Sequence, residues 1–236
     1  MDFDVVVIGA GPAGLSFARA LSVGEAGAGQ TPLRIALIES QPEATLASPA
    51  FDGREIALTH FSARVLRELG LWDRFPADAV SPLRDAKVLN GLSLHGMNIE
   101  HRHGNKDELG YLISNHLIRK AAYEVVKDSP NVTLICDAKV TDLRTDADGG
   151  QVTMADGKTL RASLVVAADS RFSAARRAMG ISARMHDFGK VMMVCQMEHD
   201  EPHEHVAWEW FDYGQTLALL PMNDDPVLGL EVGAQR

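Results

Sequence analysis

The sequence predicts an α/β fold in which a part built on a parallel sheet is followed by a β-rich part. Three observations predict it. Val5-Val6-Val7-Ile8 is a continuous β-branched run, typical of a strand buried on both faces of a parallel sheet. A glycine-rich turn at 9–14 and a helical segment at 15–21 follow it directly. After residue 182 the chain holds several extended segments with no helical pattern between them.

The turn after the first strand reads Gly9-Ala10-Gly11-Pro12-Ala13-Gly14, the G-x-G-x-x-G fingerprint between a strand and a helix. Gly9 allows the tight turn, Gly11 lets a pyrophosphate approach the backbone, and Gly14 lets the helix pack closely on the strand. The helix start offers N–H groups and a positive dipole end to phosphate, and Pro12 suits its first turn. The sequence therefore predicts a Rossmann-like domain that binds a dinucleotide.

A second predicted strand at 33–38 ends at Glu39, 25 residues after Gly14. A carboxylate at this place accepts hydrogen bonds from the ribose hydroxyls of an adenosine. It would also repel a 2′-phosphate, which disfavours NADP as the ligand of this site. Glu39 is therefore the predicted ribose-binding residue.

The segments that follow combine helices and strands. Helical spacing predicts a helix at 61–69 that ends at Gly70, and another that is capped by Ser114 or Asn115 and runs to about residue 127. A buried strand at 164–168 is expected to end at Asp169, before a short helix that reaches Gly180. The other predicted strands lie in 87–100, in 131–166 with a turn at 148–150 and a two-residue hairpin turn at 156–157, and at 191–197, 206–211, 217–220 and 227–232.

The composition excludes several classes of protein. The 236 residues carry a net charge of −9, which argues against general nucleic-acid binding. No apolar run approaches the roughly 20 residues of a membrane span. The acidic start, Met1-Asp2-Phe3-Asp4, does not predict a signal peptide. Cys136 and Cys195 form neither a disulfide framework nor a metal pair, and we expect two ordinary buried thiols.

The histidines raise the question of a metal site. His199, His203 and His205 alternate with acidic residues, a pattern that can chelate a transition metal. His101 and His103 would share one face of a strand. We interpret the first group as a solvated loop, because its proline and charges suit a connection, and we expect no metal.

Two groups of apolar residues lie in the β-rich part. Met192, Met193 and Met197 are expected in the core. Trp208 and Trp210 are expected on one face of a strand, where they either pack or line a substrate cavity.

Four blocks of sequence, taken together, resemble one family. They are Gly9-Ala10-Gly11-Pro12-Ala13-Gly14; Asp52-Gly53-Arg54-Glu55-Ile56-Ala57-Leu58 with Leu69-Gly70-Leu71-Trp72; Gly110-Tyr111-Leu112-Ile113-Ser114-Asn115; and Val165-Val166-Ala167-Ala168-Asp169-Ser170-Arg171-Phe172-Ser173-Ala174-Ala175-Arg176. These blocks resemble the class A flavoprotein monooxygenases, and most closely the ubiquinone-biosynthesis flavin hydroxylases. The Arg-x-x-Ala-Leu element followed by Leu-Gly-Leu-Trp is the more particular signature, and the resemblance covers essentially the whole chain.

The resemblance implies a Rossmann-like FAD-binding domain of the glutathione-reductase type, with an inserted and following β-rich substrate domain. The FAD-binding domain would comprise residues 1–81 and 105–182, and the substrate domain residues 82–104 and 183–236. The family has a third FAD motif downstream, similar to Gly-Asp-Ala-Ala-His, and nothing of that form occurs before Arg236. We therefore expect a C-terminally truncated chain with an incomplete substrate domain.

The dinucleotide implied by the resemblance is FAD. Matched position by position, Gly9, Gly11, Ala13 and Gly14 would hold its pyrophosphate, and Glu39 would bind its adenosine ribose.

Further positions match the family outside the first fingerprint. Arg54 would approach FAD from the following loop, where a guanidinium makes forked hydrogen bonds to phosphate or ribose oxygens. Asn115 would contact FAD near its middle. Asp169 matches the aspartate of the family's Asp-Gly motif, which interacts with FAD and NAD(P)H, and Arg176 matches its trailing arginine. Ser170 replaces the glycine of that motif, so either the turn tolerates serine or the motif is weakened.

The implied reaction is hydroxylation of the aromatic ring of a polyprenylated phenol in ubiquinone biosynthesis. NAD(P)H would reduce FAD, O₂ would add to give a flavin hydroperoxide, and its distal oxygen would pass to the ring. The sequence identifies no catalytic residue. The implied partners are a prenylated phenolic small molecule and O₂, with a peripheral membrane or biosynthetic-complex association as an option. The expected location is cytoplasmic, with the inner membrane surface as the alternative.

Three alternatives stay open at this point. The chain could be an FAD-dependent hydroxylase of another aromatic substrate, because class A enzymes resemble one another too closely around FAD for the motifs to name a substrate. It could be a truncated, non-catalytic nucleotide-binding chain. It could also be an NAD-linked dehydrogenase, although no catalytic Tyr/Lys or His/Asp pair is evident in the sequence.

Overall fold

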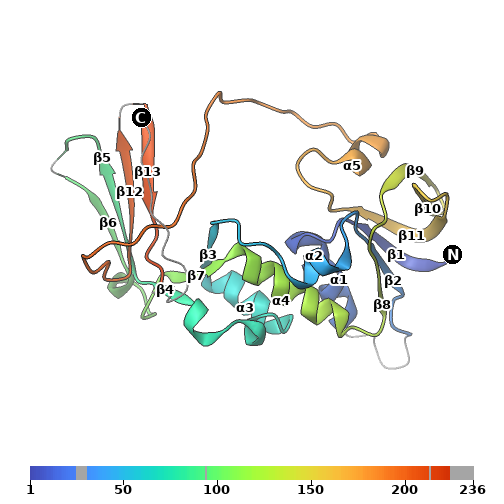
Figure 1. Ribbon diagram of the computed structural model, residues 1–236, viewed down its shortest axis with the longest axis horizontal. Helices are drawn as coiled ribbons and strands as arrows, with labels where there is room; N and C mark the ends of the chain where they lie inside the picture. Colours follow the sequence, from blue (N-terminus) through green and yellow to red (C-terminus); the bar gives the residue numbers. More distant parts are fainter. Residues whose placement is uncertain (25–30, 94, 213, 224–236) are drawn as a thin grey trace. The chain divides into compact units, whose positions relative to one another are not determined.

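Six strands form the sheet that the N-terminal sequence predicts (Figure 1). The computed structural model describes residues 1–24, 31–93, 95–212 and 214–223. Within the chain, contacts define a first unit of residues 1–50, 69–71 and 118–190, and a second unit of residues 51–68, 72–117 and 191–236.

The sheet of the first unit is parallel in its first four strands. β1 pairs in parallel with β2 on one side and with β11 on the other, and β8 extends the sheet beyond β2. β10 and β9 continue it as an antiparallel meander. In spatial order the strands are β8 (Val132–Ile135), β2 (Ile35–Ile38), β1 (Phe3–Ile8), β11 (Thr159–Ala167), β10 (Gly149–Met154) and β9 (Val140–Asp146).

Both faces of the parallel strands are covered, which explains their unbroken apolar sequences. Every residue of β2 is buried. Val6 and Ile8 of β1 lie in a core cluster with residues of the meander and Ala175. Val5 and Val7 point to the opposite face because side chains alternate along a strand, and α1 (Pro12–Val23) contacts β1, β2 and β8. The other helices of this unit are α2 (Glu43–Ala47), α5 (Ala174–Ala178) and α4 (Asn115–Lys127) from Ile118 onward.

The second unit contains a small antiparallel sheet with the order β3-β7-β4. Its strands are β3 (Glu55–Thr59), β7 (Gly110–Ser114) and β4 (Ser81–Leu83). β3 leads directly into α3 (His60–Glu68), which ends before Gly70, whose φ is +78°. The guanidinium of Arg67 lies 3.9 Å from the ring centroid of Trp72. Trp72 is the last residue of the Leu-Gly-Leu-Trp signature, so the signature has a packing role.

A four-stranded sheet completes the second unit, in the order β13-β12-β5-β6. β12 runs parallel to β5, so segments from the middle and the end of the chain share one sheet. The strands are β5 (Asp85–Asn90), β6 (Met97–Glu100), β12 (Val206–Asp212) and β13 (Gln215–Leu219), and 3₁₀ helices occupy Trp72–Arg74, Ala77–Ala79 and His101–His103.

The prediction of a strand at 191–197 is wrong, because these described residues are neither paired nor helical. An apolar β-branched sequence forms a strand only where a neighbouring strand accepts its hydrogen bonds. The methionines of this segment are therefore exposed rather than in the core: Met192 is 81% exposed and Met193 65%. The predicted strand at 227–232 lies outside the described residues.

The two cysteines differ from the expected pair of buried thiols. Cys195 is exposed, because it lies in the unpaired segment. Cys136 is half-buried beside the acidic residues Glu43 and Glu39. Burial, reinforced by these carboxylates, raises the pKa of the Cys136 thiol to about 11.

Three local predictions also need correction. His101 and His103 lie in a 3₁₀ helix and not on a strand, because the N–H of His101 donates to the Asp85 carboxylate and turns the chain. The connection between β10 and β11 has four residues, 155–158, instead of two. β11 is not fully buried: Leu164 is 51% exposed, because the meander pairs only with the first part of the strand.

The division into an FAD-binding domain and a substrate domain stays a prediction. The two units are defined by contacts within the chain, whereas the predicted domains are defined by the ligands they would bind. Among the described residues, no helix is long and apolar enough to cross a membrane.

Candidate functional site

Two glycines of the turn between β1 and α1 are required by the packing of the chain itself. Gly9 has a φ of +102°, and a Cβ on it would lie 2.5 Å from the carbonyl oxygen of Ala168. A Cβ on Gly14 would lie 1.9 Å from the carbonyl oxygen of Gly9, far inside van der Waals contact. The tight turn and the close helix that the sequence predicts are both confirmed.

Gly11 is different, because no packing contact explains it. A Cβ on Gly11 would meet no atom within 4 Å, and its φ of −72° suits any residue. The first hydrogen bond of α1 runs from the Leu15 N–H to the Gly11 carbonyl oxygen, so the N–H groups of Ala13 and Gly14 precede it at the helix start. This open backbone beside a positive helix end fits the pyrophosphate of a dinucleotide.

Glu39 lies next to this turn. Its Oε2 accepts a hydrogen bond from the Ala10 N–H at 2.7 Å, and its Oε1 accepts from the Gln41 N–H at 2.9 Å. The Ser40 hydroxyl also donates to Oε1, at 3.1 Å. These bonds fix the carboxylate at the end of β2 and leave a free lone pair on Oε2. The geometry fits an acceptor for ribose hydroxyls.

Asp169 follows β11 and its Cα lies close to Gly9, so the structure brings it to the same turn. Its carboxylate is used within the chain: Oδ2 accepts from the Ala175 N–H at 3.0 Å, and Oδ1 accepts from the Ser173 hydroxyl. Ser173 is the N-cap of the short helix α5, where its hydroxyl oxygen accepts from the Arg176 N–H at 2.8 Å, and Asp169 supports this cap. Its predicted contact with FAD or NAD(P)H stays a prediction.

Ser170 stands where the Asp-Gly motif of the family has glycine, and it adopts a backbone conformation that favours glycine. Its φ is +80°, in the left-handed region that non-glycine residues rarely occupy. The turn is thus formed with serine, at the cost of backbone strain. Arg176, the trailing arginine, donates from Nη1 to the carbonyl oxygen of Ile181 at 2.5 Å.

Arg54 and Asn115 meet in the second unit, on the carboxylate of Asp52. The Arg54 Nε and Nη2 groups donate to Asp52 Oδ2 at 3.0 and 2.5 Å, and Asn115 Nδ2 donates to the same oxygen at 2.8 Å. Partial burial acts to raise the pKa of Asp52, but the hydrogen bonds from Arg54 and Asn115 outweigh it and lower the pKa to about 2. The predicted role of Asn115 as a helix cap is replaced by this side-chain contact.

A second carboxylate lies beside this cluster. Glu55, directly after Arg54, accepts a hydrogen bond from the Ser114 hydroxyl across the β3–β7 pair. Burial is the main cause that raises the pKa of Glu55. Sequence reasoning assigned no role to Asp52 or Glu55. The Asp-x-Arg spacing was the available signal for Asp52, because residues two apart on an extended chain share one face.

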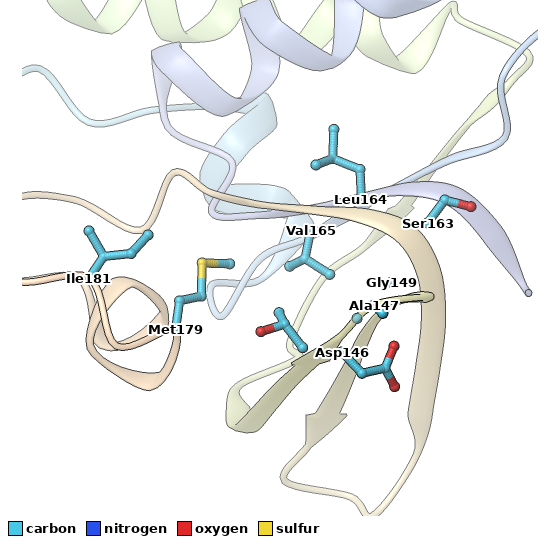
Figure 2. Close-up of a pocket in the computed structure, with 10 residues that line it drawn as sticks. Asp146, Ala147, Gly149, Ser163, Leu164, Val165, Met179 and Ile181 are labelled. Atoms are coloured by element: carbon cyan, nitrogen blue, oxygen red, sulfur yellow. The ribbon is translucent and has the colours of Figure 1, made fainter.

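An open hollow of about 340 Å³ lies elsewhere in the first unit, at the β9–β10 turn. Figure 2 shows Val165 pointing toward it, between Met179 and Ile181 on one side and Asp146 and Gly149 on the other. None of the predicted site residues lines this hollow. It is wide open to solvent and lies away from the turn between β1 and α1, so we do not assign the dinucleotide to it.

The histidine tract is hydrogen-bonded within the chain. His203 Nε2 donates to the carbonyl oxygen of Met222 at 2.8 Å, and its Nδ1 accepts from the His205 N–H at 3.0 Å; the tautomer is assigned from these two bonds. Over the part of the chain that the structure describes, no group of three or more His, Cys, Asp or Glu is arranged to hold a metal ion.

Trp208 and Trp210 lie on one face of β12, as the sequence predicts, because they are two residues apart in the strand. Trp210 Nε1 donates to the carbonyl oxygen of Gly91 at 3.0 Å, and Lys87 Nζ lies 4.4 Å from the ring centroid of Trp208. Both rings remain about two-fifths exposed. They are therefore available for contact with an apolar ligand.

The chain is similar to two ubiquinone hydroxylases over most of its length. The ubiquinone hydroxylase UbiM of Neisseria meningitidis is 50% identical over 225 residues, covering 94% of this chain and 47% of that protein. The ubiquinone hydroxylase UbiL of Rhodospirillum rubrum is 35% identical over 223 residues, covering 93% of this chain and 49% of that protein. The chain thus spans about half the length of the curated relatives it matches.

Solved structures share the fold. PqsL, a probable FAD-dependent monooxygenase from Pseudomonas aeruginosa, matches with a TM-score of 0.60 and 19% identity, over 79% of this chain and 48% of that one. The p-nitrophenol 4-monooxygenase PnpA from Pseudomonas putida matches with a TM-score of 0.57 and 24% identity, over 75% of this chain and 43% of that one. Residues 2–229 match the model of the FAD binding domain family. The chain belongs to that family, and its predicted resemblance to the class A flavoprotein monooxygenases is confirmed.

Proposed function

We propose that this chain is the FAD-binding part of a monooxygenase that hydroxylates the aromatic ring of a polyprenylated phenol in ubiquinone biosynthesis, with NAD(P)H as reductant. The observation that carries the proposal is the 50% identity with the ubiquinone hydroxylase UbiM across 94% of this chain. The open backbone at Gly11 supports the cofactor, because a dinucleotide needs that approach and the packing of the chain does not.

Four of the predicted cofactor residues in the first unit have a definite task in this proposal. Gly11, with the N–H groups of Ala13 and Gly14, binds the pyrophosphate, since partial positive charge at a helix start favours phosphate. Glu39 accepts from the adenosine ribose hydroxyls, and the carboxylate is already held in place by Ala10 and Gln41.

The second unit supplies the other proposed contacts. Arg54 donates to phosphate or ribose oxygens, and Asn115 contacts FAD near its middle. Arg54 is the side chain best suited to oxyanions in this cluster, because a guanidinium presents several donors in one plane.

Bound FAD would supply the redox chemistry, activating O₂ for transfer of one oxygen atom to the ring. The chain's own tasks are to hold that cofactor and to present apolar surface to a prenylated ring. Trp208 and Trp210, with Leu217 and Leu219 opposite them on β13, form such a surface on one face of the four-stranded sheet. None of these four side chains can donate or accept a proton in the reaction, so their proposed role is to bind and orient the ring.

The experiment is reconstitution. The purified protein is mixed with FAD, freed of unbound flavin by gel filtration, and examined for visible flavin absorbance; NADH and NADPH oxidation are then followed with and without a prenylated phenol. We expect bound flavin, and oxidation that the phenol stimulates. A colourless protein that binds NAD tightly instead would contradict the proposal and favour the dehydrogenase.

A further inference from the structure

Asp52 is the centre of the cluster in the second unit. Its carboxylate accepts from the Arg54 backbone N–H at 3.2 Å, from the Arg54 guanidinium twice, and from the Asn115 side chain. Its side chain is 27% exposed, whereas that of Arg54 is 54% exposed. The carboxylate is thus directed toward the chain and the guanidinium toward solvent.

Asp52 determines the direction in which the guanidinium of Arg54 points. A guanidinium carries five N–H donors in a fixed plane. Asp52 takes the edge formed by Nε and Nη2, and no acceptor for Nη1 lies within the described ranges of the chain. The edge formed by Nη1 and the second Nη2 hydrogen is therefore left to face an oxyanion, in the geometry that makes a forked pair of hydrogen bonds.

Asp52 also determines which way the amide of Asn115 faces. An ionised carboxylate only accepts hydrogen bonds, so the atom of Asn115 that faces Asp52 must be the amide nitrogen. The carbonyl oxygen of Asn115 is then directed away from Asp52 as an acceptor. Asp52 thereby leaves the free edge of Arg54 to donate hydrogen bonds to a ligand, and the carbonyl oxygen of Asn115 to accept them from a ligand.

We propose that Asp52 is a positioning residue for FAD: its carboxylate holds the guanidinium of Arg54 and the amide of Asn115 in the orientations in which they contact the cofactor. This inference rests on the proposed function, because it requires Arg54 to contact FAD. Asp52 itself does not touch the cofactor. Its negative charge would repel phosphate, and its oxygens are occupied by the residues it orients.

The test compares FAD affinities by flavin fluorescence titration for four proteins: wild type, Asp52→Asn, Arg54→Ala and the double variant. Asp52→Asn keeps the shape of the side chain but loses the charge and lets Asn115 turn over. We expect Asp52→Asn to raise the Kd for FAD about tenfold, and Arg54→Ala to raise it at least as much. The double variant should raise the Kd by less than the product of the two single effects, because part of the effect of Asp52 passes through Arg54 and only the part that passes through Asn115 remains in Arg54→Ala.

Asp142→Asn is the matched control. In β9, Arg144 Nε donates to Asp142 Oδ2 at 3.0 Å, the same distance and sequence spacing as in the Asp52–Arg54 pair. This variant removes an equivalent ion pair from a place where no cofactor contact is proposed. Its Kd for FAD and its thermal midpoint should equal those of wild type, whereas Asp52→Asn should still unfold cooperatively, with a midpoint lowered by roughly 2–8 °C through the loss of its ion pair.

The outcomes separate the two proposals. If Arg54→Ala binds FAD as wild type does, the proposed contact of Arg54 fails and this inference fails with it. If Arg54→Ala weakens binding but Asp52→Asn does not, or if the two effects simply add, Asp52 is not a positioning residue while the contact of Arg54 stands. Should Asp52→Asn lose its cooperative unfolding, Asp52→Glu decides: it keeps the charge but displaces it, and wild-type affinity in a folded Asp52→Glu protein overturns the inference.

Discussion

Gly11 and Gly14, on either side of Pro12-Ala13, are expected to respond in opposite ways to the same substitution by alanine. Gly14→Ala inserts a Cβ 1.9 Å from the Gly9 carbonyl oxygen, so α1 must move away from β1. Gly11→Ala inserts a Cβ that meets no atom within 4 Å, at a φ that alanine adopts freely. We therefore expect Gly14→Ala to damage the fold, and Gly11→Ala to spare the fold and damage FAD binding.

The magnitudes follow from the contacts. Overpacking of this kind costs about 3 kcal/mol, which lowers the thermal midpoint of a chain of this size by roughly 6–12 °C. Gly11→Ala should leave the midpoint unchanged or raise it slightly, since alanine at a compatible position gains about 0.4–1 kcal/mol. Its methyl group would hold a pyrophosphate away from the N–H groups at the helix start. The loss of one or two charge-assisted hydrogen bonds, about 1.5–3 kcal/mol each, raises the Kd for FAD by roughly 10- to 20,000-fold.

Calorimetry of the FAD-free proteins and fluorescence titration with FAD measure the two effects separately. The reasoning is refuted if Gly11→Ala binds FAD with wild-type affinity, because the open backbone then has no role in cofactor binding. It is equally refuted if Gly11→Ala unfolds as early as Gly14→Ala.

Three further predictions concern strain, thiol chemistry and pH. Ser170→Gly should raise the free energy of unfolding by about 1 kcal/mol, because glycine adopts the φ of +80° without strain; a midpoint below that of wild type would contradict this. Iodoacetamide at mildly alkaline pH should modify the exposed Cys195 first and leave Cys136 largely unmodified, because the pKa of the Cys136 thiol is about 11; mass spectrometry of the peptides checks the order. Because the pKa of Asp52 falls from 3.8 unfolded to about 2 folded, its ion pair with Arg54 contributes stability above about pH 4 that is lost as the pH falls toward 2. Denaturant titrations should show about 1–2 kcal/mol of this acid loss in wild type and none of it in Asp52→Asn.

Local sequence signals predicted the part of the molecule that local chemistry determines. The β-branched run, the three glycines and Glu39 specify a strand, a turn and a second strand end, and each signal depends only on its neighbours in the chain. The structure places Glu39 beside Ala10 because parallel strands β1 and β2 end at the same edge of the sheet.

Predictions failed where the outcome depends on residues far away in the sequence. Residues 191–197 have a strand's composition but no partner strand among the residues that the structure describes, so their methionines are exposed. Leu164 is exposed in a strand that the apolar pattern predicted as buried, because the antiparallel meander pairs only with the first part of β11, up to Ala162. Asp52 was missed because its importance comes from Asn115, which lies 63 residues away and is brought to it by the β3–β7 pairing.

The central claim is oxygen transfer to a prenylated aromatic ring, and isotope labelling tests it most directly. The purified protein is supplied with FAD, NAD(P)H and a polyprenylated phenol under ¹⁸O₂, and the product is analysed by mass spectrometry. The account predicts a product that has gained one ¹⁸O atom, in an amount that falls in parallel with FAD affinity in Gly11→Ala. NAD(P)H oxidation that yields only hydrogen peroxide, or a product without label, from a fully FAD-loaded protein would contradict it.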